Sequence, residues 1–89
     1  MLNIYPNPVN SQPVLIDYIL EDKSQVKCQV YDAAGRIIRT LISGEQIAGQ
    51  HTVSWDQKDN NGSIVNAGIY FIRLDTENDC AQGKLIITN

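Results

Sequence analysis

The chain has 89 residues, of which 43% are hydrophobic and 19% charged, and its formal net charge is -3. This length and composition fit one globular domain. The acidic balance argues against nucleic-acid binding, which usually needs a basic face, and gives no support for docking on anionic lipid. We expect no membrane insertion, because no apolar run approaches the roughly 20 residues that span a bilayer. The first six residues lack the features of a secretion signal, so an exported domain would depend on a signal elsewhere in a larger parent.

Apolar residues recur at every second position along most of the chain, which is the period of a half-buried β-strand. Polar or proline-containing segments interrupt this pattern, beginning with Pro6-Asn7-Pro8, which cannot continue a strand ladder. We expect seven strands: one before Pro6, then Val14–Leu20, Val26–Tyr31, Arg36–Ile42, a strand containing Val53–Trp55, Ile69–Asp75 and Ala81–Thr88.

Tight turns separate these strands at short intervals. Asp32-Ala33-Ala34-Gly35 has the aspartate and glycine that a type I turn favours at its first and last positions, and Asp59-Asn60-Asn61-Gly62 predicts a second turn. Segments 43–49 and 76–79 are expected to be further connections. The sequence therefore predicts an all-β fold, a seven-stranded immunoglobulin/fibronectin-like antiparallel β-sandwich. Tyr18, Trp55 and Tyr70 are expected to anchor its core.

The strand at 69–75 is apolar on both faces, because Ile69 and Phe71 lie opposite the set that contains Tyr70 and Ile72. One interpretation is that neighbouring side chains, including the stem of Arg73, cover the outward pair. The other is that Ile69 and Phe71 form a docking patch for a partner or for the parent protein.

The sequence offers little for catalysis. His51, the single histidine, is expected on a strand as an exposed residue, without the carboxylate and nucleophile that a catalytic imidazole needs. Cys28 and Cys80 fit two free thiols, although a disulfide stays open in an oxidising compartment. The acidic segment 56–62 does not match a calcium-binding loop at either end. We predict no catalytic residues, no metal site, no cofactor and no enzymatic activity.

Several motifs occur in an order that carries a resemblance to known domains. The motifs are YPNP at 5–8, VYDAAGR at 30–36, AGQHTVSW at 48–55, AGIYFIRL at 67–74 and KLII at 84–87. Together they resemble the C-terminal sorting domains of type IX secretion (type A family). They are also similar to the immunoglobulin-like domain of flagellar hook-cap proteins. The YPNP start and the chain end soon after KLII favour the sorting interpretation, whereas Thr88-Asn89 replaces the basic ending common in that family.

The sorting resemblance implies a non-catalytic secretion signal, in which residues 1–89 form one domain covalently linked to a cargo domain of a larger parent. Its implied partners are the outer-membrane type IX translocon and a sortase-like peptidase that removes the domain. The implied location is the periplasm in transit and then the surface or exterior of a Gram-negative cell.

The last strand is the candidate recognition element. Leu85 and Ile87 would pack inward and Lys84 and Ile86 would be presented, on an open edge that could accept a partner strand; the strand could equally be a simple closing strand. The full candidate set is Lys84, Leu85, Ile86, Ile87, Thr88 and Asn89.

Two other classes of function stay open. The hook-cap similarity implies a structural or assembly module that associates through Ile69 and Phe71. A carbohydrate-binding accessory module would use exposed aromatic side chains, for which Tyr5, Tyr31 and Phe71 are the candidates.

Overall fold

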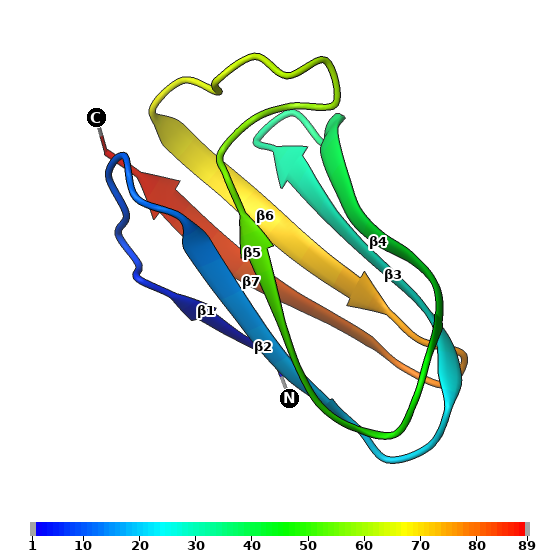
Figure 1. Cartoon of the computed structure of the whole chain (residues 1–89). Helices are drawn as coiled ribbons and strands as arrows, with labels where there is room; N and C mark the ends of the chain where they lie inside the picture. Colours follow the sequence, from blue (N-terminus) through cyan, green and yellow to red (C-terminus); the bar gives the residue numbers. More distant parts are fainter. Residues whose placement is uncertain (1, 89) are drawn as a thin grey trace.

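A computed structural model, which describes residues 2–88, consists of two antiparallel sheets packed face to face (Figure 1). The strands are β1 Leu2–Tyr5, β2 Val14–Leu20, β3 Ser24–Asp32, β4 Ile37–Gln46, β5 Gly49–Trp55, β6 Gly68–Asp75 and β7 Cys80–Ile87. One sheet has the order β1-β2-β5 and the other the order β4-β3-β6-β7. The predicted immunoglobulin-like sandwich is therefore confirmed. Within the part of the chain that the structure describes, no helix is long and apolar enough to cross a membrane.

The core forms where the alternating apolar faces of the two sheets meet. On β2, Val14, Ile16 and Tyr18 are almost fully buried, and each residue between them is more exposed. Trp55 is completely buried and meets Tyr70 edge to face, with ring centroids 6.2 Å apart. The three predicted aromatic anchors thus lie in the core. Fifteen buried hydrophobic residues within the range 2–88 form this one cluster, as expected of a domain too short for a second core.

The turn between β3 and β4 follows from its aspartate and glycine. The backbone NH of Gly35 donates to the carbonyl of Asp32 at 3.0 Å, and Gly35 has φ of +85°. The Asp32 carboxylate accepts backbone NH groups from Ala34 and Arg36, both at 2.9 Å. These bonds lower the pKa of Asp32, with the bond from the Arg36 backbone as the largest cause. The predicted turn is confirmed, and the hairpin places β4 beside β3.

Strand β4 differs from the prediction, because it extends through Ser43–Gln46, where we expected a connection. Two register shifts opposite β3 interrupt the regular alternation of its side chains. In this last part of the edge strand the backbone pairs with β3 while Ser43 and Glu45 are exposed to water, so polar residues do not end it. The alternation rule therefore placed its end too early.

Tyr70 also fixes the crossover between the two sheets. Its hydroxyl donates to the carbonyl of Asn66 at 2.6 Å, four residues upstream and just before β6. This is the tyrosine corner of immunoglobulin-like sandwiches. Burial is the main cause that raises the pKa of Tyr70, so the hydroxyl stays protonated as a donor.

Candidate functional site

The outer face of the four-stranded sheet carries an apolar patch that crosses all four strands. In the sheet register Tyr31 lies opposite Ile37 on one side and Phe71 on the other, and Ile69 lies opposite Ile86. Directly opposed residues project to the same face. Ile37 is 51% exposed and Ile69 is 46% exposed. We call these five residues the outer patch.

One residue of the patch, Tyr31, is held in place by side-chain hydrogen bonds. The Tyr31 hydroxyl donates to Gln29 Oε1 at 3.0 Å, and Gln29 Nε2 donates to Thr40 Oγ1 at 3.1 Å. This chain of bonds runs across β3 and onto β4, so it restricts the Tyr31 ring. A side chain that is already ordered loses less conformational entropy when a partner binds.

A shallow hollow of about 310 Å³ lies beside the patch. It is lined by Tyr31, Asp32, Ala33, Gly35, Phe71, Arg73 and Gln82. Arg73 borders it through a planar guanidinium whose Nε donates to both oxygens of Asp75, at 3.1 and 3.2 Å. The hollow thus joins two aromatic residues to one cationic residue, Arg73, and one acidic residue, Asp32.

The outer face of the three-stranded sheet has a different chemistry. There the Asp17 carboxylate accepts hydrogen bonds from the Tyr5 hydroxyl at 2.9 Å and from Thr52 Oγ1 at 2.7 Å. The hydrogen bond to Asp17 is the main cause that raises the pKa of Tyr5. Tyr5 therefore lies on the opposite sheet from Tyr31 and Phe71, so the three aromatics considered for carbohydrate binding do not form one row.

The edge of β7 is already occupied beside the patch. Asn7 Nδ2 donates to the carbonyl of Lys84 at 2.7 Å, and Asn7 Oδ1 accepts the NH of Ile86 at 3.0 Å. One residue pair further on, the NH of Val9 donates to the Ile86 carbonyl and the NH of Thr88 donates to the Val9 carbonyl. Val9 itself is buried. The expectation of an open edge at the last strand is therefore wrong for this half of β7, because residues 7–9 fill it.

The opposite edge of the sheet is occupied in a similar way. The NH of Asn60 donates to the Ile38 carbonyl at 3.0 Å, and Asn60 Oδ1 accepts the NH of Thr40 at 3.2 Å. Ile38 and Thr40 are on β4, next to the Ile37 end of the patch. At the level of the patch, both edges of the four-stranded sheet are therefore blocked, and its face is the accessible surface.

The candidate residues of the last strand divide between core and surface as expected. Leu85 and Ile87 are buried, whereas Lys84 is exposed and Ile86 half-buried. Lys84 pairs with Phe71, so the predicted recognition strand and the predicted docking patch share one face. Thr88 is exposed, and Asn89 lies outside the described residues. A role for residues 84–89 in recognition stays a prediction.

His51 is half-buried, which differs from the exposed position that we expected. Its ring stacks on Tyr18 with centroids 5.1 Å apart and planes 17° apart, and its Nε2 lies 2.8 Å from the carbonyl of Ile47. The residue faces inward because it pairs in register with Tyr18, which points into the core. In this position His51 acts as a packing residue.

The acidic segment 56–62 uses its carboxylates as turn acceptors. Asp59 Oδ1 accepts the NH groups of Asn61 and Ser63, both at 2.9 Å, which confirms the predicted turn. Asp56 Oδ1 accepts from Arg39 at 3.2 Å. No group of three metal-ligating residues occurs between positions 2 and 88.

The two thiols lie in different environments. Cys28 is fully buried on β3, and burial raises its pKa to about 11. Cys80 is exposed at the start of β7, and its pKa is raised mainly by the hydrogen bond with Asp75. Both cysteines are free.

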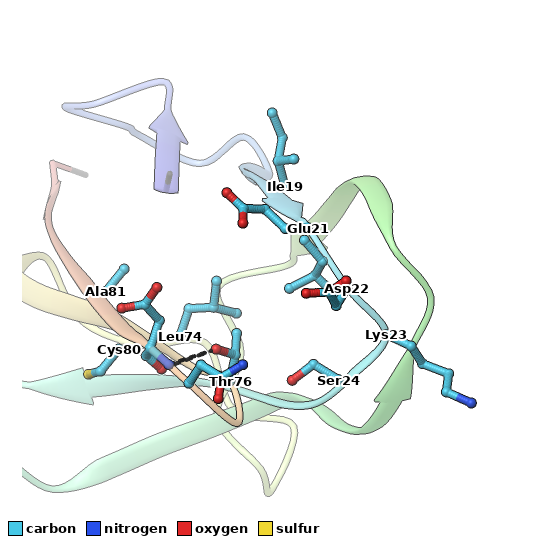
Figure 2. A pocket seen from close by; sticks show the side chains of 12 residues that line it. Ile19, Glu21, Asp22, Lys23, Ser24, Leu74, Thr76, Cys80 and Ala81 are labelled. Carbon is cyan, nitrogen blue, oxygen red and sulfur yellow. Dashed lines mark hydrogen bonds between the residues drawn. The ribbon is translucent and has the colours of Figure 1, made fainter.

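A second hollow, of about 370 Å³, opens at the end of the sandwich between the β2–β3 and β6–β7 connections (Figure 2). In Figure 2 the side chain of Lys23 points away from it. Ser24, which lines it, accepts the NH of Glu77 through Oγ at 3.0 Å, and the Glu77 carboxylate accepts the NH of Gln25 at 3.1 Å. These bonds tie the two connections together, so the Ser24 hydroxyl has a structural use.

The FlgD Ig-like domain family matches the chain over residues 8–79. The chain belongs to this family. This FlgD Ig-like domain is 40% identical over 58 residues to the basal-body rod modification protein FlgD of Salmonella typhimurium, and equally to that of Salmonella typhi. The aligned part covers 65% of the chain and 25% of each relative, so the chain spans about a quarter of their length.

Solved structures agree with this FlgD Ig-like fold. FlgD from P. aeruginosa has a TM-score of 0.70 and 27% identity, over 89% of this chain and 64% of the other. Two proteins of Porphyromonas gingivalis share the fold at lower identity. The type IX secretion component PorZ has a TM-score of 0.69 and 16% sequence identity, over 99% of this chain and 11% of the PorZ chain. Latent PorU has a TM-score of 0.79 and 17% sequence identity, over 98% of this chain and 9% of the PorU chain. The immunoglobulin-like relation is confirmed, whereas the likeness to PorZ and PorU is one of fold.

Proposed function

We propose that this domain is a non-catalytic assembly module that docks onto a protein partner through the outer patch of its four-stranded sheet. The observation that carries the proposal is the patch itself, which crosses four strands while Asn7 and Asn60 block the strand edges on either side. Contiguous apolar surface of this kind marks interaction sites in soluble proteins. The hydrogen-bonded Tyr31 adds a rigid aromatic contact.

Family membership supports a role in assembly. The relatives in Salmonella are named for modification of the basal-body rod. We infer by analogy that the parent of this domain takes part in building a structure at or beyond the cell surface, with the domain as one of its docking units.

The experiment compares Phe71→Ser with Ile19→Ser in the full-length parent. Both substitutions replace an apolar residue on an outer sheet face, but Ile19, which is 60% exposed, lies on the other sheet. We expect Phe71→Ser to lower the fraction of protein that co-sediments with purified surface assemblies, and Ile19→Ser to leave it unchanged. Fluorescence of the single, buried Trp55 checks that both variants fold. A folded Phe71→Ser variant that assembles normally would refute the proposal.

A second candidate function is the type IX sorting signal. It is favoured by a direct contact between the two motifs that carried the resemblance, because Asn7 of YPNP bonds to Lys84 and Ile86 of the KLII segment. In this proposal the translocon recognises that joined end, and a sortase-like peptidase then separates the domain from its cargo. Residues 1–89 fused behind a periplasmic reporter should reach the surface of a cell with type IX secretion. Retention of a folded fusion in the periplasm would exclude this function.

A further inference from the structure

We infer that the outer patch binds a protein segment in which bulky aliphatic side chains are flanked by carboxylates. The inference rests on the proposed docking function and adds the chemistry of the partner. It comes from the cations beside the patch, the residues that line the hollow, and the hydrogen bonds that already occupy the sheet edges.

Two cations stand next to Phe71. Lys84 lies directly opposite it on β7, and Arg73 lies two residues along on β6, on the same face. Arg73 uses Nε to bind Asp75, and its terminal amino groups make no hydrogen bond with any residue in the range 2–88. Over the same range, no acidic group lies within 4.0 Å of the Lys84 amine.

The chain has a net charge of -3, and among the residues 2–88 four cations form ion pairs: Lys23, Arg36, Arg39 and, through Nε to Asp75, Arg73. Lys84, like Lys27 and Lys58, is in none of these pairs. The Lys84 amine and the terminal amino groups of Arg73 therefore keep donors available beside the patch in an otherwise acidic protein. A partner with carboxylates at the rim would complement them, which favours the correct orientation and speeds association.

The hollow limits what can occupy the patch. Its volume of about 310 Å³ lies at the lower end of the usual range for small-molecule sites, roughly 300–1,000 Å³, and it is open to solvent. Because Tyr31 and Phe71 belong to its lining, it suits an aliphatic side chain, and Arg73 and Asp32 are also among the lining residues.

Two other occupants fit less well. A second copy bound symmetrically through the same face would place two surfaces that each carry Lys84 and Arg73 against one another, because such an interface uses one surface twice. An added strand would need free backbone groups, but the edges at this level are bonded to Asn7 and Asn60. An acidic, leucine-bearing segment laid on the face meets neither obstacle.

The test uses three short peptides, in which leucines alternate with glutamate, with glutamine or with lysine. Each is titrated into the isotopically labelled domain, and amide shifts are followed by nuclear magnetic resonance at low and high salt. We expect the leucine–glutamate peptide to shift the amides of Tyr31, Phe71 and Lys84, and to bind more weakly at high salt. The leucine–lysine peptide should cause no shift there.

Lys84→Gln has a matched control in Lys58→Gln, which removes the same charge from an exposed residue of the 56–67 connection. We expect Lys84→Gln to weaken binding of the leucine–glutamate peptide about threefold to fivefold, as for one rim charge, and Lys58→Gln to change it little. The inference is overturned if the glutamine or lysine peptide binds as tightly, if the two variants behave alike, or if the shifts map to another surface. The co-sedimentation test with Phe71→Ser does not depend on these peptides. If the acidic peptide fails to bind but Phe71→Ser still impairs assembly, the docking function is kept and only the acidic chemistry of the partner is rejected.

Discussion

Replacing Asn7 with alanine should open the edge of β7 and destabilise the domain by an amount that the structure bounds. The substitution removes the donor to the Lys84 carbonyl and the acceptor of the Ile86 NH, at 2.7 and 3.0 Å. Each bond contributes about 0.5–1.5 kcal/mol net. Both are solvent-exposed, and we therefore expect a total loss of about 1–2 kcal/mol. For a domain of this size the melting temperature should fall by about 5–10 °C.

Thermal and denaturant unfolding, followed by the fluorescence of Trp55, measures the loss of stability. Amide hydrogen exchange provides the local readout, because the NH of Ile86 loses its acceptor and should exchange faster. Asn3→Ala is the control, since Asn3 is an exposed β1 residue whose side chain makes no hydrogen bond within residues 2–88. Unchanged stability together with unchanged protection of Ile86 would refute the conclusion that Asn7 closes this edge.

Three further predictions concern Tyr70 and the cysteines. Tyr70→Phe removes the bond to Asn66 and should cost about 1 kcal/mol in denaturant unfolding; unaltered stability would show that the tyrosine corner is dispensable. A thiol reagent should label exposed Cys80 in the folded protein and buried Cys28 only after unfolding, and equal labelling rates would contradict this difference. Burial raises the pKa of Cys28 from 9.0 to about 11, so its contribution to stability is complete below pH 9 and is lost as the pH rises towards 11. This loss should reach about 1.4 kcal/mol near pH 10, and a Cys28→Val variant that keeps the same pH dependence would exclude this cause.

The sequence predicted the fold well because the core of this sandwich is built from regular alternation. The faces of Val14–Leu20 and Val26–Tyr31 were visible as period-two patterns, and the aspartate and glycine of the first hairpin turn marked its place. Strand β4 was misjudged at its C-terminal end, since an edge strand pairs through its backbone and tolerates polar side chains such as Ser43.

The site was only partly predictable. Ile69 and Phe71 stood out because both faces of their strand are apolar, but their meeting with Tyr31, Ile37 and Ile86 depends on strand order and register, which no local pattern encodes. No pattern in the sequence indicated that Asn7 and Asn60 block the sheet edges. Each bonds to a strand far away in the chain, Asn7 to β7 and Asn60 to β4. The inward direction of His51, in contrast, was visible in the sequence, because His51 lies at alternate positions on the same strand face as Val53 and Trp55.

Radical footprinting of the protein, free and in its assembled state, tests the docking surface most directly. Aromatic side chains are oxidised where water reaches them, and the two sheets offer an internal comparison. Assembly should protect Tyr31 and Phe71, on the outer patch, and leave Tyr5 on the opposite sheet as reactive as before. Protection of Tyr5 with no change at Tyr31 and Phe71 would show that the domain docks through another surface.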